Sequence, residues 1–174
     1  MQKPRSPMKK LRIPLLVALA AVLALGAVPA VAGTDQNTFQ VTASVVPSCR
    51  FTTSVDLDFG ELDVYGFGTK LANGSVSVLC TKNGSYTIAL DNGVTPDGSG
   101  NRQMANGTAV LPYEIYQDQA TTSVWKDGAN ALAFTGDGLV DSQTVYGVLV
   151  WTQDMLPNAP VGSYQDTVTA TVSY

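Results

Sequence analysis

The sequence predicts an all-β protein, and its body is expected to form a β-sandwich. Tight-turn dipeptides recur along residues 33–174: Asn-Gly at 73–74, 83–84, 92–93 and 106–107, and Asp-Gly at 97–98, 127–128 and 137–138. Both dipeptides supply the positive φ angles that hairpin turns require. Between them lie short runs rich in Val, Thr, Tyr and Ile, which favour strands. No segment of 33–174 has the apolar spacing of an amphipathic helix.

The first 32 residues have the features of a secretory signal peptide. A basic start is followed by an apolar run at 15–25 and by Ala30-Val31-Ala32. A membrane anchor would need 18 or more apolar residues, and this run is shorter. We expect cleavage after Ala32 and export of a one-domain chain, residues 33–174.

The expected strands follow in order along the exported chain. The run TVYGVLVW at 144–151 is apolar on both faces, which favours a central strand. Pro112 lacks an amide donor, so its strand is expected at an edge or to begin there. The turn-rich residues 91–110 are expected to form a long loop. The strands are predicted near 39–46, 51–59, 75–80, 85–90, 111–117, 144–151 and 163–174.

The two terminal segments alternate most regularly between apolar and polar residues. The first has Phe39, Val41, Ala43 and Val45 on one face, and the last has Val168, Ala170, Val172 and Tyr174. An apolar terminal strand leaves an unpaired edge that something must cover. Residues 39–46 could be the first strand of a self-complete sandwich, or they could fill the groove of another molecule.

Cys49 and Cys80 are the two cysteines, and in an exported protein an even pair predicts a disulfide. Two free thiols or a metal pair are the alternative, but the chain has no histidine to complete a metal site. All fourteen acidic residues lie in 33–174 with only five basic ones, so the net charge of this part is 5 − 14 = −9. Such a surface repels phosphate backbones, which excludes nucleic acid as a partner.

No residue pattern predicts catalysis, a cofactor or a metal. The acidic segment with Asp56, Asp58, Glu61 and Asp63 lacks the spacing of a calcium loop, and its alternation predicts a solvated strand face opposite Leu57 and Phe59. Without histidine the usual nucleophilic triads are absent.

The two tryptophans leave a sugar-binding role open. Aromatic rings can stack on sugars, and sandwich cores also bury Trp. We expect Trp151 to be a core residue because of its strand. For Trp125 both roles stay open.

The exported chain resembles the spore coat protein U domain family, which includes the secreted pilins of archaic (Csu-type) chaperone–usher fimbriae. The resemblance rests on an ordered set of segments. They are FQVTASV at 39–45, Cys49, LDFG at 57–60, VSVLC at 76–80, Arg102-x-Met104, LPYEIYQD at 111–118 and the closing segment 162–174.

The resemblance implies an incomplete immunoglobulin-like β-sandwich (the pilin fold), completed by donor-strand complementation. Residues 33–47 would be the donor segment and 48–174 the pilin domain. Phe39, Val41, Ala43 and Val45 would enter a groove lined by Val168, Ala170, Val172 and Tyr174, and Cys49–Cys80 would staple the neighbouring strands.

The resemblance also implies partners and a location. The partners would be identical or related subunits, a periplasmic chaperone and an outer-membrane usher. The product would be a fimbria on the cell surface, serving adhesion and biofilm formation. A secreted carbohydrate-binding module and a spore or cell-coat protein are the alternatives.

Overall fold

The computed structural model describes residues 32–174; the predicted signal peptide lies outside this range except for Ala32. The chain divides into two units, Met1–Ala43 and Ser44–Tyr174, and every strand belongs to the second unit. Within the described residues no helix is long and apolar enough to cross a membrane.

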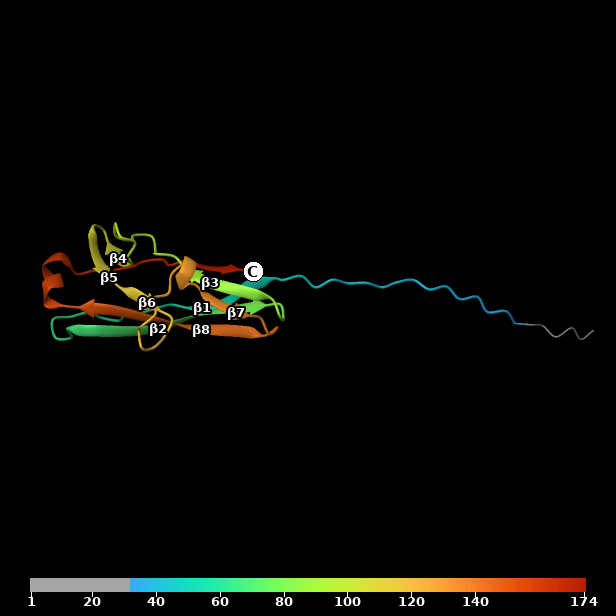
Figure 1. The fold of residues 1–174 in the computed structure, drawn as a ribbon. Coiled ribbons are helices and arrows are strands. Elements are labelled where there is room, and N and C mark those ends of the chain that lie inside the picture. Colours follow the sequence, from blue (N-terminus) through green and yellow to red (C-terminus); the bar gives the residue numbers. More distant parts are fainter. Residues whose placement is uncertain (1–31) are drawn as a thin grey trace, which may run out of the picture. The chain divides into compact units, whose positions relative to one another are not determined.

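The second unit is a β-sandwich, as the turn and strand pattern predicts (Figure 1). One sheet has the order β1-β2-β8-β6 and the other the order β7-β3-β9, while β4 and β5 form a separate hairpin. The strands are β1 (Cys49–Val55), β2 (Gly68–Cys80), β3 (Ser85–Leu90), β4 (Gln103–Asn106), β5 (Ala109–Pro112), β6 (Glu114–Tyr116), β7 (Leu132–Thr135), β8 (Val140–Trp151) and β9 (Ala170–Ser173). Two short 3-10 helices, η1 (Gly128–Asn130) and η2 (Gln153–Asn158), complete the elements.

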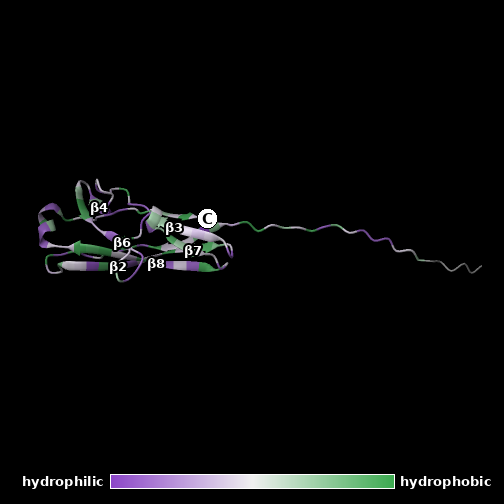
Figure 2. Ribbon diagram, viewed as in Figure 1, coloured by the Kyte–Doolittle hydropathy of each residue, from purple (hydrophilic) through white to green (hydrophobic). Residues whose placement is uncertain are grey.

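The antiparallel pair β2–β8 sets the long axis of the sandwich. Its register runs from Gly68 opposite Trp151 to Leu79 opposite Val140. β8 lies between β2 and β6, which confirms the prediction of a central strand. The carboxyl-terminal half of β8 is the strongly hydrophobic part of this strand (Figure 2). With 13 residues, β2 is about 40 Å long, so its two ends lie at opposite ends of the body.

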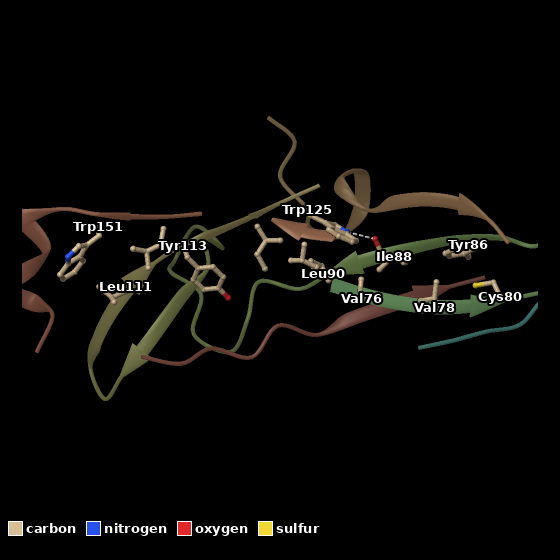
Figure 3. Close-up of a cluster of buried hydrophobic side chains, with 13 residues drawn as sticks. Val76, Val78, Cys80, Tyr86, Ile88, Leu90, Leu111, Tyr113, Trp125 and Trp151 are labelled. Atoms are coloured by element: carbon tan, nitrogen blue, oxygen red, sulfur yellow. Dashed lines mark hydrogen bonds between the residues drawn. The ribbon is translucent and has the colours of Figure 1, made fainter. Parts of the chain in front are cut away.

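The core fills the space between the two sheets and extends along that axis from Cys80 to Trp151 (Figure 3). Trp125 is fully buried, and its Nε1 donates a hydrogen bond of 3.0 Å to the carbonyl of Ile88. Trp151 is buried as well, and its Nε1 donates to the carbonyl of Asp63 at 2.8 Å. Trp151 is a core residue, as predicted, and sugar stacking is the wrong role for Trp125.

The disulfide between Cys49 and Cys80 is present and joins the first residue of β1 to the last residue of β2. Directly beside the disulfide, Ser48 and Thr81 are joined by hydrogen bonds that each residue donates to the other. The Ser48 amide donates to the Thr81 hydroxyl at 3.0 Å, and the Thr81 amide donates to the Ser48 carbonyl at 2.9 Å. The chain therefore enters the sandwich at a fixed point.

Several predicted boundaries are wrong. The strand expected at 51–59 ends at Val55, and only 170–173 of the expected 163–174 form a strand. The expected loop 91–110 contains β4 and the start of β5, and the expected strand 111–117 is divided because Tyr113 turns from the hairpin to β6. β7 was not predicted. Residues 39–46 lie outside any strand, since none of the described residues pairs with them.

Candidate functional site: an apolar groove beside the last strand

A groove of about 600 Å³ opens between two segments that each overlap one end of a strand and are largely outside the strand ladders. One wall is residues 54–59, which comprise the end of β1 and its continuation toward the Gly68 end of the body. The other wall is residues 164–170, which lead into β9. The floor combines side chains from both sheets and the β4–β5 hairpin: Val76, Leu90, Met104, Tyr113, Ile115 and Val145.

Local sequence explains the first wall. After Val55 the side chains still alternate between the core and solvent, although the segment is no longer part of a strand. Leu57 and Phe59 pack against the core, while Asp56 and Asp58 are exposed. This arrangement confirms the predicted solvated acidic face, although the segment is not a strand. Leu57 lies directly against Gly147 of β8, a position where a side chain would occupy the same space.

The second wall is held on one side only. Gln165 exchanges two backbone hydrogen bonds with Ala105 of β4, at 2.8 and 3.1 Å. The Asp91 amide donates to the Thr169 carbonyl at 3.0 Å. Beyond it β9 pairs with β3. The backbone N–H and C=O groups of successive residues in an extended chain point to alternate sides. Since residues 165 and 169 bond away from the groove, the backbone groups of residues 166, 168 and 170 point toward it.

Within residues 32–174, no hydrogen bond joins the backbone amide or carbonyl of Val168 to another group, and the same holds for Leu57 on the opposite wall. The groove thus offers two unpaired edges above an apolar floor. Unpaired strand edges are templates for the addition of another strand.

Two carboxylates fix the position of the second wall. Asp166 accepts hydrogen bonds from the Tyr113 hydroxyl at 2.6 Å and from the amides of Val94 and Thr167, both at 2.8 Å. Asp91 accepts from the amides of Gly93 and Thr169, both at 2.9 Å. The wall is thereby joined to the floor and to the loop that follows β3.

The Tyr113–Asp166 contact has an electrostatic consequence. Burial of Tyr113, its hydrogen bond to Asp166 and the negative charge of that carboxylate raise the pKa of the tyrosine hydroxyl well above its usual value. Tyr113 therefore stays a hydrogen-bond donor across the physiological pH range.

The groove does not reach the Cys80 end of the body. β1 and β9 lie close to each other, and residues 49–53 do not line the groove. Toward the Gly68 end of the body the lining ends at Phe59 and Tyr164, and this end is here called the mouth of the groove.

The four residues named as donors carry exposed side chains. Phe39, Val41 and Val45 are 86%, 87% and 85% exposed, and Ala43 is exposed too. Singly exposed apolar residues are common, but a regular series of them along one extended segment indicates an interaction surface.

The four residues named for the receiving groove do not all lie in it. Val168 and Ala170 line the groove, and Val172 packs against the core cluster. Tyr174 lines a separate shallow hollow with Tyr86 and Phe134. The floor residues were not predicted, because they come from six different segments.

The described residues contain no group of three His, Cys, Asp or Glu side chains placed to hold a metal ion. In the acidic segment Asp58 and Asp63 instead accept hydrogen bonds from nearby amides. Asp58 accepts from Gly60 at 2.8 Å, and Asp63 accepts from Tyr65 and Gly66 at 3.0 and 2.8 Å. These carboxylates stabilise the turns between β1 and β2.

An all-β sandwich with open sheets, one disulfide and a groove beside its last strand has the fold of pilin subunits. Solved structures agree. The chaperone–tip adhesion subunit pre-assembly complex CsuC–CsuE from archaic Csu pili of Acinetobacter baumannii matches with a TM-score of 0.53 and 23% identity, over 75% of this chain and 40% of that one. The P pilus rod subunit PapA matches with a TM-score of 0.53 and 16% identity, over 72% of this chain and 98% of that one.

The chain belongs to the Spore Coat Protein U domain family, whose model matches residues 35–171. A relative, Protein U of Myxococcus xanthus, is 30% identical over 181 residues, covering 95% of this chain and 98% of that protein. The family resemblance read from the sequence is confirmed.

Proposed function

We propose that the protein is a structural subunit of a surface pilus, and that it polymerises when the N-terminal segment of one copy enters the groove of the next. The observation that carries this proposal is the pair of unpaired backbone edges at Leu57 and Val168 above an apolar floor. A single extended strand can satisfy both edges and cover the floor.

The segment around Phe39 suits that groove chemically. Its apolar side chains recur at every second position, which is the spacing needed to point into one groove. Burying Phe39, Val41 and Val45 would stabilise the complex by about 1.5–3 kcal/mol each. A slip of one residue would turn these side chains to solvent, so the register is strict.

The position of the groove mouth supports one direction of insertion. Val45 is the donor residue nearest its own body, so it occupies the open mouth near Phe59 and Tyr164. Phe39 then lies deeper, toward Val55 and Ala170. The donor consequently runs antiparallel to residues 164–170, the more stable strand pairing.

Synthetic peptides test the groove. A recipient chain without residues 33–45 is mixed with a peptide of residues 33–47, and binding is measured by calorimetry. The wild-type peptide should bind. Val41→Asp should lower its affinity by at least about a hundredfold because a charge enters an apolar groove, while Thr42→Asp on the opposite face should change it little. Equal effects of the two substitutions would contradict insertion with this register.

Polymerisation is tested in the full chain. Purified subunits should form ladders of multimers that resist SDS, because a strand inserted into a neighbour is released slowly. A chain without residues 33–45 should accept a donor but should not act as one. Normal fibres from that truncated chain would contradict the proposal.

The proposed setting is export by the predicted signal peptide, transient protection of the groove by a periplasmic chaperone, and assembly at an outer-membrane usher into a surface fimbria that serves adhesion and biofilm formation. A spore or cell coat could use the same strand exchange. Electron microscopy of producing cells distinguishes the two, since only a fimbria gives filaments that leave the surface.

A further inference from the structure

The first anchored residue of the β-sandwich, Ser48, follows closely after the donor segment in the sequence. Ser48 is fixed to Thr81 by the two backbone-linked hydrogen bonds, and Cys49 is fixed to Cys80 by the disulfide. Only Val46 and Pro47 lie between the last donor residue and this anchored serine. Three Cα–Cα steps span at most about 11 Å.

This short tether has a consequence that rests on the proposed function. With Val45 in the mouth of a recipient, Ser48 of the donor must lie within about 11 Å of that mouth. The end of the donor around Ser48, here called the exit end, then faces the end of the recipient around the groove opening, here called the mouth end. The two bodies are thereby held close together beyond the inserted strand.

The two ends differ in charge. The mouth end carries Asp58, Glu61, Asp63 and Asp154, all exposed, with Lys70 as the nearby cation beside Asp63. Two mouth ends would therefore repel each other.

The exit end is different. It carries Arg50 and Lys82, both exposed, together with Asp137 and Asp141. Both carboxylates already accept internal hydrogen bonds, Asp137 from the Leu139 amide at 2.7 Å and Asp141 from the Tyr86 hydroxyl at 2.8 Å. The two cations have no such bond among the described residues.

The other described cations lie elsewhere. Arg102 and Lys126 both pair with Glu114, and Lys70 belongs to the mouth end. Arg50 and Lys82 are thus the two cations that the exit end offers to another molecule, and each lies within two residues of the anchored pair Ser48–Thr81 or the disulfide.

Exposed apolar side chains accompany the charges at both ends. Leu139 at the exit end is 69% exposed, and Tyr65 and Val161 at the mouth end are 93% and 106% exposed. An apolar centre with charged groups around it is the usual composition of a protein interface.

We propose that the exit end of one copy docks on the mouth end of the next, with Arg50 and Lys82 of the donor facing Glu61 and Asp154 of the recipient. This second contact selects head-to-tail approach before the strand inserts. It also stiffens the junction, because the bodies are joined by a surface as well as by a two-residue tether.

Charge reversal on each side tests the contact. The donor is the full chain carrying Arg50→Glu and Lys82→Glu, and the recipient is the chain without residues 33–45 carrying Glu61→Lys and Asp154→Lys. All four side chains are exposed, and within residues 32–174 they make no hydrogen bond or ion pair, so the fold should persist. The rate of donor–recipient dimer formation is measured at low ionic strength.

Either reversed partner, mixed with a wild-type partner, should assemble roughly three- to tenfold more slowly, as expected for interfacial charge pairs. The two reversed partners together should regain the wild-type rate. A recipient with Asp127→Lys, which changes charge away from both ends, should assemble normally. The proposed contact would be overturned if each reversed partner assembled with a wild-type partner at the wild-type rate. It would also be overturned if the two reversed partners together did not regain that rate.

The peptide of residues 33–47 separates this inference from the proposed function. It has no body, so the reversed recipient should bind it within about twofold of the wild-type recipient. A peptide that binds neither recipient would overturn strand insertion itself. A peptide that loses binding to the reversed recipient alone would overturn the assignment of these charges to body–body contact.

Discussion

The Tyr113 hydroxyl donates a hydrogen bond of 2.6 Å to Asp166, which joins the floor of the groove to its second wall across 53 residues of sequence. Asp166 also accepts from two backbone amides, so one carboxylate positions three segments. The wall borders the groove with half-buried side chains, and this bond is one of the few contacts that hold it in place.

We expect Tyr113→Phe to lower the free energy of unfolding by about 1.5–3 kcal/mol, the range for a hydrogen bond to a charged group. Denaturant unfolding of the disulfide-bonded chain measures this. Tyr65→Phe is the matched control, since Tyr65 is 93% exposed and its hydroxyl has no partner among the described residues. An equal effect of the two substitutions would show that the Tyr113 hydroxyl contributes nothing specific.

Tyr86 makes the stability of the folded protein depend on pH in the alkaline range. Burial, the hydrogen bond to Asp141 and the charges of Asp141 and Asp137 raise the pKa of Tyr86 to about 12. A tyrosine in the unfolded chain titrates near pH 10. The contribution of the protonated Tyr86 hydroxyl to the stability of the folded chain is therefore fully present below about pH 10 and is lost as pH rises through about 12.

Absorbance of tyrosinate during a pH titration should therefore show one group of the native chain ionising near pH 12. In Tyr86→Phe this component should disappear, and the loss of stability between about pH 10 and pH 12 should become smaller. An unchanged titration curve would refute the assignment to Tyr86.

Arg102 is a fully buried cation that holds several segments together. Its guanidinium donates to Glu114 at 2.6 Å and to the carbonyls of Asp91 and Trp125, the shortest of these at 2.7 Å. Arg102→Met should lower the free energy of unfolding by about 3–5 kcal/mol, because carbonyls and a carboxylate lose their partner in the interior.

Arg50→Met is the control for Arg102. Arg50 is exposed, and its replacement should change stability by less than about 0.5 kcal/mol. Thermal unfolding of both variants at one pH tests the contrast. Similar small losses would show that the Arg102 network is not a major contribution to stability.

The Cys49–Cys80 disulfide closes a loop with a sequence separation of 31. Replacing both cysteines with Ala should lower the free energy of unfolding by about 3.5 kcal/mol, mainly through the unfolded chain. Reductant should destabilise the wild-type chain by a similar amount and should leave the double variant unchanged. A wild-type chain insensitive to full reduction would contradict this expectation.

The parts of the fold that follow from local pattern could be predicted from the sequence. β3 was placed at its observed bounds, and β8 was predicted as central because both of its faces are apolar. The acidic segment was predicted as solvated because its alternation separates Asp56 from Leu57. Each of these features depends on side-chain spacing alone.

The groove required information that spacing does not contain. Tyr113, Leu90 and Val145 meet on its floor because of long-range strand order, which local patterns do not specify. Arg102 was noted only as part of a motif, and nothing in the sequence marks it as fully buried. Tyr174 continues the alternation of the last strand, but it lines the separate hollow beside Tyr86 and Phe134.

The two tryptophans lie in different parts of the core (Figure 3). Trp125 is buried in the middle of the body against Ile88, whereas Trp151 lies at the groove-opening end, with Phe67 at a ring distance of 6.2 Å. A chain with Trp125→Phe would retain one indole, at the end where the proposed neighbour would dock. Its fluorescence would then give an optical signal for each proposed joining event without an added label.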